Sequence, residues 1–325
     1  VKMSYDSEWA AHDGHSISRP PSAGEFLADR LFRAMAYAAG ILVVALLVYI
    51  VWKIGVDAAP AMARHGFGFL TTAVWDPGKG EFGILAEIWG TLYSSILALL
   101  IAGFFGVAVA IFLTQDFLDA RLARVFRAMV EMLASIPSVV FGLWGIFVVI
   151  PASRPVADWL HGYFGWFPPF STSLSGPGLA PAVVVLAIMV LPTVAAISQD
   201  AFSLIPYKVK EAAYGMGTTK WEAILKVMLP TASSGIAASL VLGFGRALGE
   251  TMALAMLIGN SNQISWSIFS PANTLASLLA SQFPEASGPE VEALMYAAIV
   301  LLLISLVVNM IGTVIMALSA KQTVS

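Results

Sequence analysis

The feature that most constrains this chain is the clustering of its apolar residues into long segments with almost no charge. Six such segments can be marked along the 325 residues, at about 34–52, 85–114, 129–150, 179–199, 232–258 and 292–318. About 20 apolar residues in a helix span the roughly 30 Å hydrocarbon core of a bilayer. Backbone groups in lipid must be hydrogen-bonded within the protein, and long runs of Ala, Leu, Val, Ile and Gly favour helices over barrel strands. The sequence therefore predicts an all-α membrane protein with six transmembrane helices.

The composition excludes the usual soluble classes. Of the 325 residues, 58% are hydrophobic and only 11% are charged, with a mean hydropathy of +0.83. The formal charge of −3 provides no basic field for nucleic acid, and the lack of cysteine excludes disulfides and thiolate chemistry. The sequence shows no metal-ligand cluster, nucleophile–base pair, dinucleotide fingerprint or phosphate-binding loop. The chain is therefore not expected to hydrolyse ATP, to be an enzyme, or to hold a metal or cofactor of its own.

The lysines and arginines predict the orientation in the membrane. Of these 17 residues, twelve fall in the two tails and in the second and fourth loops, four fall in the other loops, and the last is inside a span. Because basic residues concentrate in cytoplasmic loops, both termini are placed in the cytoplasm. The predicted organisation is a flexible cytoplasmic tail (1–33), a first transmembrane helix (34–53), an extracytoplasmic loop (54–84), a transmembrane core (85–318) that contains a cytoplasmic loop at 200–231, and a cytoplasmic tail (319–325).

The fifth span contains two charges at a depth where charges are costly. Arg246 lies 16 residues after Pro230, about 24 Å along a helix, where insertion of a charge costs about 2.5–3.5 kcal/mol. Glu250 is one turn further on and can pair with Arg246, and Gly245 and Gly249 have the spacing that lets helices pack closely. Two interpretations stay open: the two charges neutralise each other and lock the helices, or Arg246 binds an anion that Glu250 tunes or releases.

The third span contains a predicted break. Pro137 removes a backbone donor and kinks or breaks the helix, which frees carbonyl groups that Ser135 and Ser138 can help to satisfy. A break at membrane depth often lines a cavity, so both serines are candidates for a substrate pathway. The alternative is a simple packing kink.

Three other features receive more ordinary interpretations. The aromatic residues of the outer loop at 151–178 are expected to form a belt at the membrane interface, with ligand stacking as the alternative. The apolar stretch at 275–280 is too short to span, so it is expected to dip into the interface or to form a short surface helix. Four acids near span ends are expected to be reached by water or headgroups: Glu87, Glu131, Asp200 and Glu292.

The loop at 200–231 is predicted to be a rigid projection on the cytoplasmic face. Residues 208–214 can form a short helix, Gly217 permits a tight turn to a second helix, and Pro230 marks the entry to the fifth span. Such a rigid projection would let another protein transmit force to the transmembrane helices. The alternative is an ordinary amphipathic loop at the membrane interface.

This loop resembles that of bacterial ABC importer permeases, whose pattern is Glu-Ala-Ala, three residues, Gly, nine residues and Ile-x-Leu-Pro. Six positions match in register, and Val227 replaces the Ile: Glu211, Ala212, Ala213, Gly217, Leu229 and Pro230. The resemblance implies the MetI-like fold of a type I ABC importer transmembrane domain. It also implies a coupling helix, containing Glu211, Ala212, Ala213 and Gly217, that docks on an ATPase subunit. ATP and Mg would then be bound by partner subunits.

Two further runs narrow the resemblance. Residues 246–251 (Arg-Ala-Leu-Gly-Glu-Thr) and 135–145 (Ser-Ile-Pro-Ser-Val-Val-Phe-Gly-Leu-Trp-Gly) are similar to phosphate importer permeases, and the outer-loop run Trp75-Asp76-Pro77 favours the PstC type over the PstA type. This implies half of an ATP-driven pathway for inorganic phosphate in the bacterial plasma membrane. The implied partners are membrane lipid, a PstA-like permease, two PstB-like ATP-binding subunits and an extracytoplasmic PstS-like phosphate-binding protein.

The alternatives concern both substrate and mechanism. Within the same class, the substrate could be sulfate, molybdate or another oxyanion. In another class, a secondary transporter or channel would use Glu250 as a proton carrier and would need no ATPase. A sensory role that reports phosphate status could coexist with transport.

Overall fold

The computed structural model describes residues 23–322, which are mostly helical and include one two-stranded hairpin. The α-helices are α1 (Ala23–His65), α2 (Gly68–Thr71), α3 (Leu85–Thr114), α4 (Ala120–Ala134), α5 (Ser138–Trp144), α6 (Ile150–Phe164), α7 (Leu179–Ser203), α8 (Tyr207–Gly215), α9 (Lys220–Ala223), α10 (Leu229–Thr231), α11 (Ser233–Leu248), α12 (Met252–Leu257), α13 (Leu275–Gln282) and α14 (Pro289–Gln322). Gly145–Val149 and Ile224–Met228 are π-helical turns, and Pro168–Phe170 is a 3₁₀ turn. The strands β1 (Trp75–Asp76) and β2 (Glu81–Phe82) pair antiparallel.

The chain forms two compact units, residues 1–53 and residues 54–325. The described part of the first unit belongs to α1, a helix longer than the predicted first span of 34–53. It begins at Ala23, inside the predicted flexible tail, and continues to His65, inside the predicted outer loop. The first turns are rich in Ala, Leu, Arg and Met, which are strong helix formers, so the apolar segment alone underestimates the helix. Residues 1–22 of the predicted tail lie outside the described residues.

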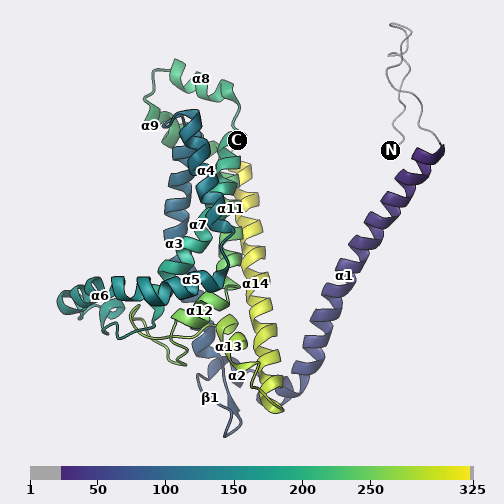
Figure 1. The fold of residues 1–325 in the computed structure, drawn as a ribbon, viewed down its shortest axis with the longest axis vertical. Helices are drawn as coiled ribbons and strands as arrows, with labels where there is room; N and C mark the ends of the chain where they lie inside the picture. The colour runs from purple at the N-terminus through teal and green to yellow at the C-terminus, as the bar shows by residue number, and fades with distance from the viewer. Residues whose placement is uncertain (1–22, 323–325) are drawn as a thin grey trace. The chain divides into compact units, whose positions relative to one another are not determined.

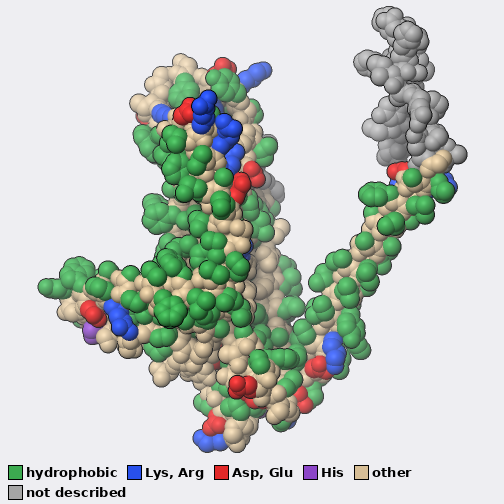
Figure 2. Space-filling view, viewed as in Figure 1, with side chains coloured by type: hydrophobic (Ala, Val, Ile, Leu, Met, Phe, Trp, Pro, Cys, Tyr) green, Lys and Arg blue, Asp and Glu red, His purple; other side chains and the backbone are tan. Residues whose placement is uncertain are grey.

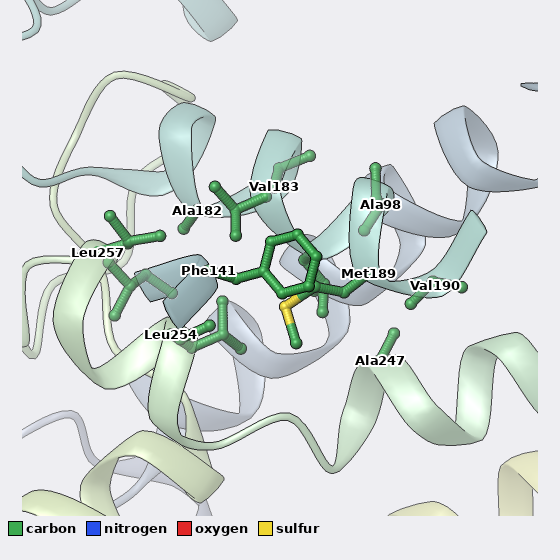
Figure 3. Close-up of a cluster of buried hydrophobic side chains, with 14 of the residues drawn as sticks. Ala98, Phe141, Ala182, Val183, Met189, Val190, Ala247, Leu254 and Leu257 are labelled. Carbon is green, nitrogen blue, oxygen red and sulfur yellow. The ribbon is translucent and has the colours of Figure 1, made fainter. Parts of the chain in front are cut away.

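The second unit is a helical bundle organised around α7. Helices α3 and α11 pack along α7, α4 packs against α7, and α14 packs along α11 (Figure 1). Figure 3 shows a part of the core in which the ring of Phe141 lies among aliphatic side chains from several helices. This arrangement buries most of α7, and it leaves α4 with no buried residue.

Close packing in the bundle depends on a glycine other than the predicted pair. A Cβ atom on Gly243 would lie 2.8 Å from Val194 Cγ2 of α7, so only glycine allows this approach. A Cβ atom on Gly245 would meet only Asn309, at 3.6 Å, and one on Gly249 would meet only nearby backbone at 3.7 Å or more. Within this subunit, Gly245 and Gly249 are therefore not needed for close helix contact.

The third predicted span is not one helix. Within residues 23–322, five helices are long and apolar enough to cross a membrane, or six when a bent pair is included, and one of these is the stretch 138–164. However, α4 runs alongside α3 and α7, whereas α5 and α6 turn across the bundle direction (Figure 1). The predicted segment 129–150 therefore combines the end of one helix with the start of another that has a different direction.

The fifth predicted span, 232–258, is also interrupted. The chain bends by 69° between α10 and α11, and α11 ends at Leu248, before α12 begins at Met252. The stretch expected to be a surface helix forms α13, where Leu275 and Leu278 are fully buried. The expectation of a surface helix is wrong, because α12, α14 and α3 all pack against α13.

Candidate functional site

Arg246 lies in the last turn of α11, on a face that the rest of the described chain leaves uncovered. Leu242 and Gly249, four residues before it and three residues after it, are also exposed, so the three form one stripe along the helix. The adjoining face packs on the core through Gly243 and Ala247. Arg246 is 13 residues from the start of α11, about 20 Å along the helix. It therefore lies near the end of a helix that belongs to a candidate membrane span.

Glu250 does not continue the helix that carries Arg246. Because α11 ends at Leu248, the backbone N–H of Glu250 donates only a long bond, 3.4 Å, to the Ala247 carbonyl. The Thr251 hydroxyl donates to the Gly249 carbonyl at 3.1 Å, which stabilises the break. In the described residues 23–322, no ion pair joins Glu250 to Arg246. The continuous helix that would place the two side chains one turn apart on one face is therefore absent from the described residues.

The break in the third span lies at Pro137, as the sequence predicts. Helix α4 ends at Ala134 and α5 begins at Ser138, with Pro137 extended between them. The Ser135 hydroxyl donates to the Met132 carbonyl at 2.7 Å, so it satisfies one of the carbonyl groups that the break releases. Ser135 is exposed and Ser138 is half-buried.

The two breaks lie in the same region of the bundle, because α5 packs along α12. A Cβ atom on Gly142 would lie 2.6 Å from Met256 Sδ, and one on Gly145 would lie 2.6 Å from a methyl group of Leu257. The residue numbers rise together along the two helices, so the helices run in the same direction. One turn earlier, the same register places Ser138 near Met252, the first residue of α12.

Two hydrogen bonds to α7 fix the relative depth of α4 and α11. Arg127 of α4 donates to Gln199 at 3.0 Å, and Ser239 of α11 shares a 2.9 Å hydrogen bond with Ser198. Because Ser198 and Gln199 are consecutive, Arg127 and Ser239 lie at the same level of the bundle.

This register places Ser135 and Arg246 at similar depths. Ser135 comes eight residues after Arg127 and Arg246 comes seven residues after Ser239, which corresponds to about 12 Å and about 10 Å of helix rise. From Arg127 to Ser135, and from Ser239 to Arg246, the chain runs antiparallel to α7 and away from the loop at 200–231. The structure therefore brings the predicted pathway residues to one level, although they come from two helices more than 100 residues apart.

The predicted coupling loop has the helix–glycine–helix form. Gly217, with φ +81°, makes the turn between α8 and α9. Thr219 and Glu222 form a capping box at the start of α9. The backbone N–H of Thr219 donates to the Glu222 carboxylate at 3.0 Å, and this bond is the main reason that the pKa of Glu222 falls to about 2. The loop is thus an ordered element with its own caps.

The loop is anchored by a buried apolar cluster and has an exposed apolar tip. Ala213 is buried, whereas Glu211 is exposed, together with Ala212 and Gly217. Large apolar side chains around them face outward, with Tyr207 73% exposed and Met216 83% exposed. Lys220 donates to the Asp116 carbonyl at 2.8 Å and lies 3.9 Å from the centre of the Phe117 ring, which ties α9 to the end of α3. Force applied to the tip would therefore reach the bundle.

Glu87 is buried, although its position in the sequence predicts access to water or headgroups. Its side chain is fully buried in the first turn of α3, and neither carboxylate oxygen has a hydrogen-bond partner among the described residues. The Thr91 hydroxyl donates to the Glu87 backbone carbonyl and accepts from the Leu275 N–H, 184 residues away, at 2.9 Å. Helix α13 therefore covers this part of α3. A position near the end of a predicted span gives no sign of this contact.

The other three acids have different surroundings. Glu131 and Asp200 are exposed in the isolated chain, and Glu292 forms an ion pair with Arg64. Of the four, Glu87 is the one that departs most clearly from the expectation of access to water or headgroups.

Comparisons with known proteins agree with this architecture. Residues 106–324 match the family described as binding-protein-dependent transport system inner membrane component. The Mesorhizobium japonicum protein named phosphate transport system permease protein PstC is 40% identical over 267 residues, which cover 81% of each chain. The Pasteurella multocida protein of that name is 39% identical over 300 residues, covering 90% of this chain and 93% of the relative. The Mycobacterium tuberculosis protein named PstC 2 is 39% identical over 279 residues, covering 83% and 85%.

Solved structures share the fold. An inward-facing MetNI methionine ABC transporter matches with a TM-score of 0.56 and 20% identity, covering 73% of this chain and 95% of that chain. A bacterial alginate ABC transporter, in complex with an alginate pentasaccharide-bound periplasmic protein, matches with a TM-score of 0.60 and 16% identity, covering 91% and 97%. At these identities the likeness concerns the fold alone, and it confirms the predicted MetI-like transmembrane architecture.

Proposed function

Because the chain belongs to the family of binding-protein-dependent transport system inner membrane components, we propose that it is a permease subunit of an ATP-driven importer of inorganic phosphate. The observation that carries this proposal is an arginine at membrane depth on an uncovered helix face, in a chain about 40% identical to proteins named phosphate transport system permeases. It is a multi-pass inner-membrane protein. Both termini face the cytoplasm, since the basic residues concentrate on that side.

Arg246 is the main anion-binding group of the pathway. A guanidinium presents a planar fork of donors that matches the oxygens of phosphate, and its charge acts more strongly in surroundings of low dielectric constant. The lack of an ion pair between Arg246 and Glu250 in the described residues supports a role in binding over a structural lock. Glu250 lies two residues after the end of α11. Its negative charge weakens anion binding and so favours release. Ser135 and Ser138 contribute hydroxyl groups near the same depth.

The uncovered face implies a partner. A charge at membrane depth is unfavourable in lipid, so the stripe that contains Arg246 faces a second permease, of the PstA type, and the two enclose the pathway. The family description includes a binding protein, so an extracytoplasmic phosphate-binding protein of the PstS type delivers the anion.

Energy comes from two ATP-binding subunits of the PstB type, which also bind the ATP and Mg. The exposed apolar tip of the coupling loop docks in a groove on one of them. When the ATP-binding subunits close, α8 and α9 move, and the contacts of Lys220 pass this motion to α3. The bundle then opens outward, accepts phosphate, and returns after hydrolysis.

The test is uptake by membrane vesicles that contain the assembled complex. Labelled phosphate should accumulate only when both ATP and the binding protein are supplied, and excess sulfate or molybdate should not compete. Accumulation without ATP would instead support a secondary transporter. Competition by sulfate would show that the substrate is a different oxyanion.

A further inference from the structure

Helix α4 carries a polar stripe that the proposed function does not yet use. Arg124, Arg127, Glu131 and Ser135 follow one another at intervals of three, four and four residues, so they lie on one face of the helix. Figure 2 shows basic side chains gathered over the end of the bundle that carries α4, α8 and α9. The remaining face of α4 is apolar, with exposed side chains at 122, 125, 126, 129 and 132.

This stripe lies along a helix that packs beside α3 and α7, two of the candidate membrane spans. Helix α4 is 15 residues long, about 22 Å, and runs alongside α3 and α7 (Figure 1). Glu131 is 11 residues from the start of α4, about 16 Å along it. Charges at such depth face a bundle interior or a water-filled cavity rather than lipid. The apolar face of α4 can meet lipid, so the polar stripe requires polar surroundings.

The hydrogen bond from Arg127 to Gln199 orients the stripe toward α7. On α7, Gln199 reaches α4, Ser198 reaches α11, and Ala195 lies against α3 at Gly106. The exposed residues of this part of α7, Ala196 and Asp200, therefore lie on the side between α4 and α11 that α3 does not cover. An open, partly polar surface thus runs between the stripe on α4 and the helix that carries Arg246.

We propose that the polar stripe of α4 lines the cytoplasmic part of the anion pathway. This inference rests on the proposed phosphate import. Ser135 lies near the depth of Arg246, and Arg127 and Arg124 lie progressively closer to the cytoplasm. An oxyanion that leaves Arg246 therefore meets two further guanidinium groups on its way out. Glu131 lies between Ser135 and Arg127 on the stripe. Its negative charge repels the anion and so prevents tight binding inside the membrane.

The chain contains no cysteine, so single cysteines can report which face of α4 meets water. In the assembled complex, Glu131→Cys and Ser135→Cys probe the stripe, while Met129→Cys and Met132→Cys are controls at similar depths on the apolar face. A membrane-impermeant anionic thiol reagent is added to the cytoplasmic side of inside-out vesicles, and labelling of this chain is followed with time. The stripe cysteines should react about tenfold faster than the controls or more, because the reactive thiolate forms readily only where water has access.

Saturating inorganic phosphate should slow labelling at 131 and 135 and leave the controls unchanged. Equal reactivity on both faces, or labelling that phosphate does not slow, would overturn the proposal. Unreactive stripe cysteines in a transport-active complex would show instead that the partner permease buries this face. Uptake by the unmodified complex distinguishes failure of the proposed function from failure of the stripe proposal. If the unmodified complex takes up no phosphate, phosphate import itself is rejected. If its uptake is normal and the stripe cysteines do not react, only the role of the stripe is rejected.

Charge substitution provides a second readout. Arg124→Gln should lower the rate of phosphate uptake by about tenfold or more, because it removes a charged hydrogen-bond donor. Arg124→Lys should keep most of the rate, since the charge remains. Co-purification of the ATP-binding subunits verifies assembly of both variants. Equal uptake by Arg124→Gln and the wild type would contradict a role in the pathway.

Discussion

Helices α7 and α11 each reach a residue that disfavours helix, yet only α11 ends there. Helix α7 contains Pro192 and remains continuous from Leu179 to Ser203, whereas α11 ends just before Gly249. Pro192 is buried and α3, α4 and α11 all pack on α7, while Gly249 and the turn before it have an exposed face. Packing therefore overrides a local breaker in the covered helix. In the uncovered helix the break persists, next to the charge that transport requires.

The comparison predicts that substitutions on covered surfaces change stability and those on uncovered surfaces change transport. The largest stability effect is expected for Phe141, whose ring is central in Figure 3 and only 6% exposed. Phe141→Ala should lower the free energy of unfolding by about 3–5 kcal/mol, because it removes a large apolar side chain and leaves a cavity. Thermal unfolding of the wild-type and Phe141→Ala subunits, purified in detergent, measures this loss of stability. Unchanged stability would mean that this cluster does not hold the bundle together.

A matched pair of glycines on α11 sharpens the comparison. Gly243→Ala should cost about 1–3 kcal/mol of unfolding free energy, because the new Cβ atom would lie 2.8 Å from Val194. Gly249→Ala, where a Cβ atom has room, should change stability by less than about 0.5 kcal/mol and should slow phosphate uptake by favouring a continuous helix. Equal effects of the two substitutions on stability would remove the distinction between covered and uncovered faces.

The turn between α8 and α9 tests the same distinction outside the membrane. Gly217 is exposed and has φ +81°, a conformation that costs about 1–2 kcal/mol for residues with a side chain. Gly217→Val should distort the loop and uncouple ATP hydrolysis from uptake, while thermal stability of the bundle changes little. The ratio of phosphate transported to ATP hydrolysed reports the effect, with Gly215→Ala in the neighbouring helix as the control. An unchanged ratio would count against the coupling role.

Glu87 is the exception within the covered region, and its predicted effect is the smallest. Glu87→Gln should raise the free energy of unfolding by about 1 kcal/mol, because a neutral amide costs less to bury without partners than a carboxyl that can ionise. Thermal unfolding and phosphate uptake are measured together. Lost uptake without a gain in stability would instead identify Glu87 as a functional group.

Local patterns in the sequence predict much of this molecule. The coupling loop follows from a short run that ends in a glycine with positive φ, and the break at Pro137 follows from the missing backbone donor. The depth of Arg246 follows from counting residues along a helix. Each of these depends on residues close together in the chain, so the sequence alone contains the physical reason.

What the sequence does not predict depends on distant contacts. The end of α11 at Leu248 depends on which face of the helix the rest of the bundle covers, since glycine is tolerated in membrane helices. The burial of Glu87 depends on α13, which joins α3 through the Thr91–Leu275 hydrogen bond across 184 residues. The shared depth of Ser135 and Arg246 depends on two hydrogen bonds to α7. Apolar length and spacing contain none of this information.

The most direct test of the central claim is phosphate uptake by complexes that contain Arg246→Gln, compared with Arg154→Gln. Arg154 is also exposed but donates to the Ser175 carbonyl outside the bundle, so it controls for loss of a positive charge. The account predicts that Arg246→Gln lowers ATP-driven uptake by about a hundredfold or more, with the subunit still assembled with its ATPases, and that Arg154→Gln transports normally. Uptake by Arg246→Gln within about twofold of the wild type would contradict the pathway role.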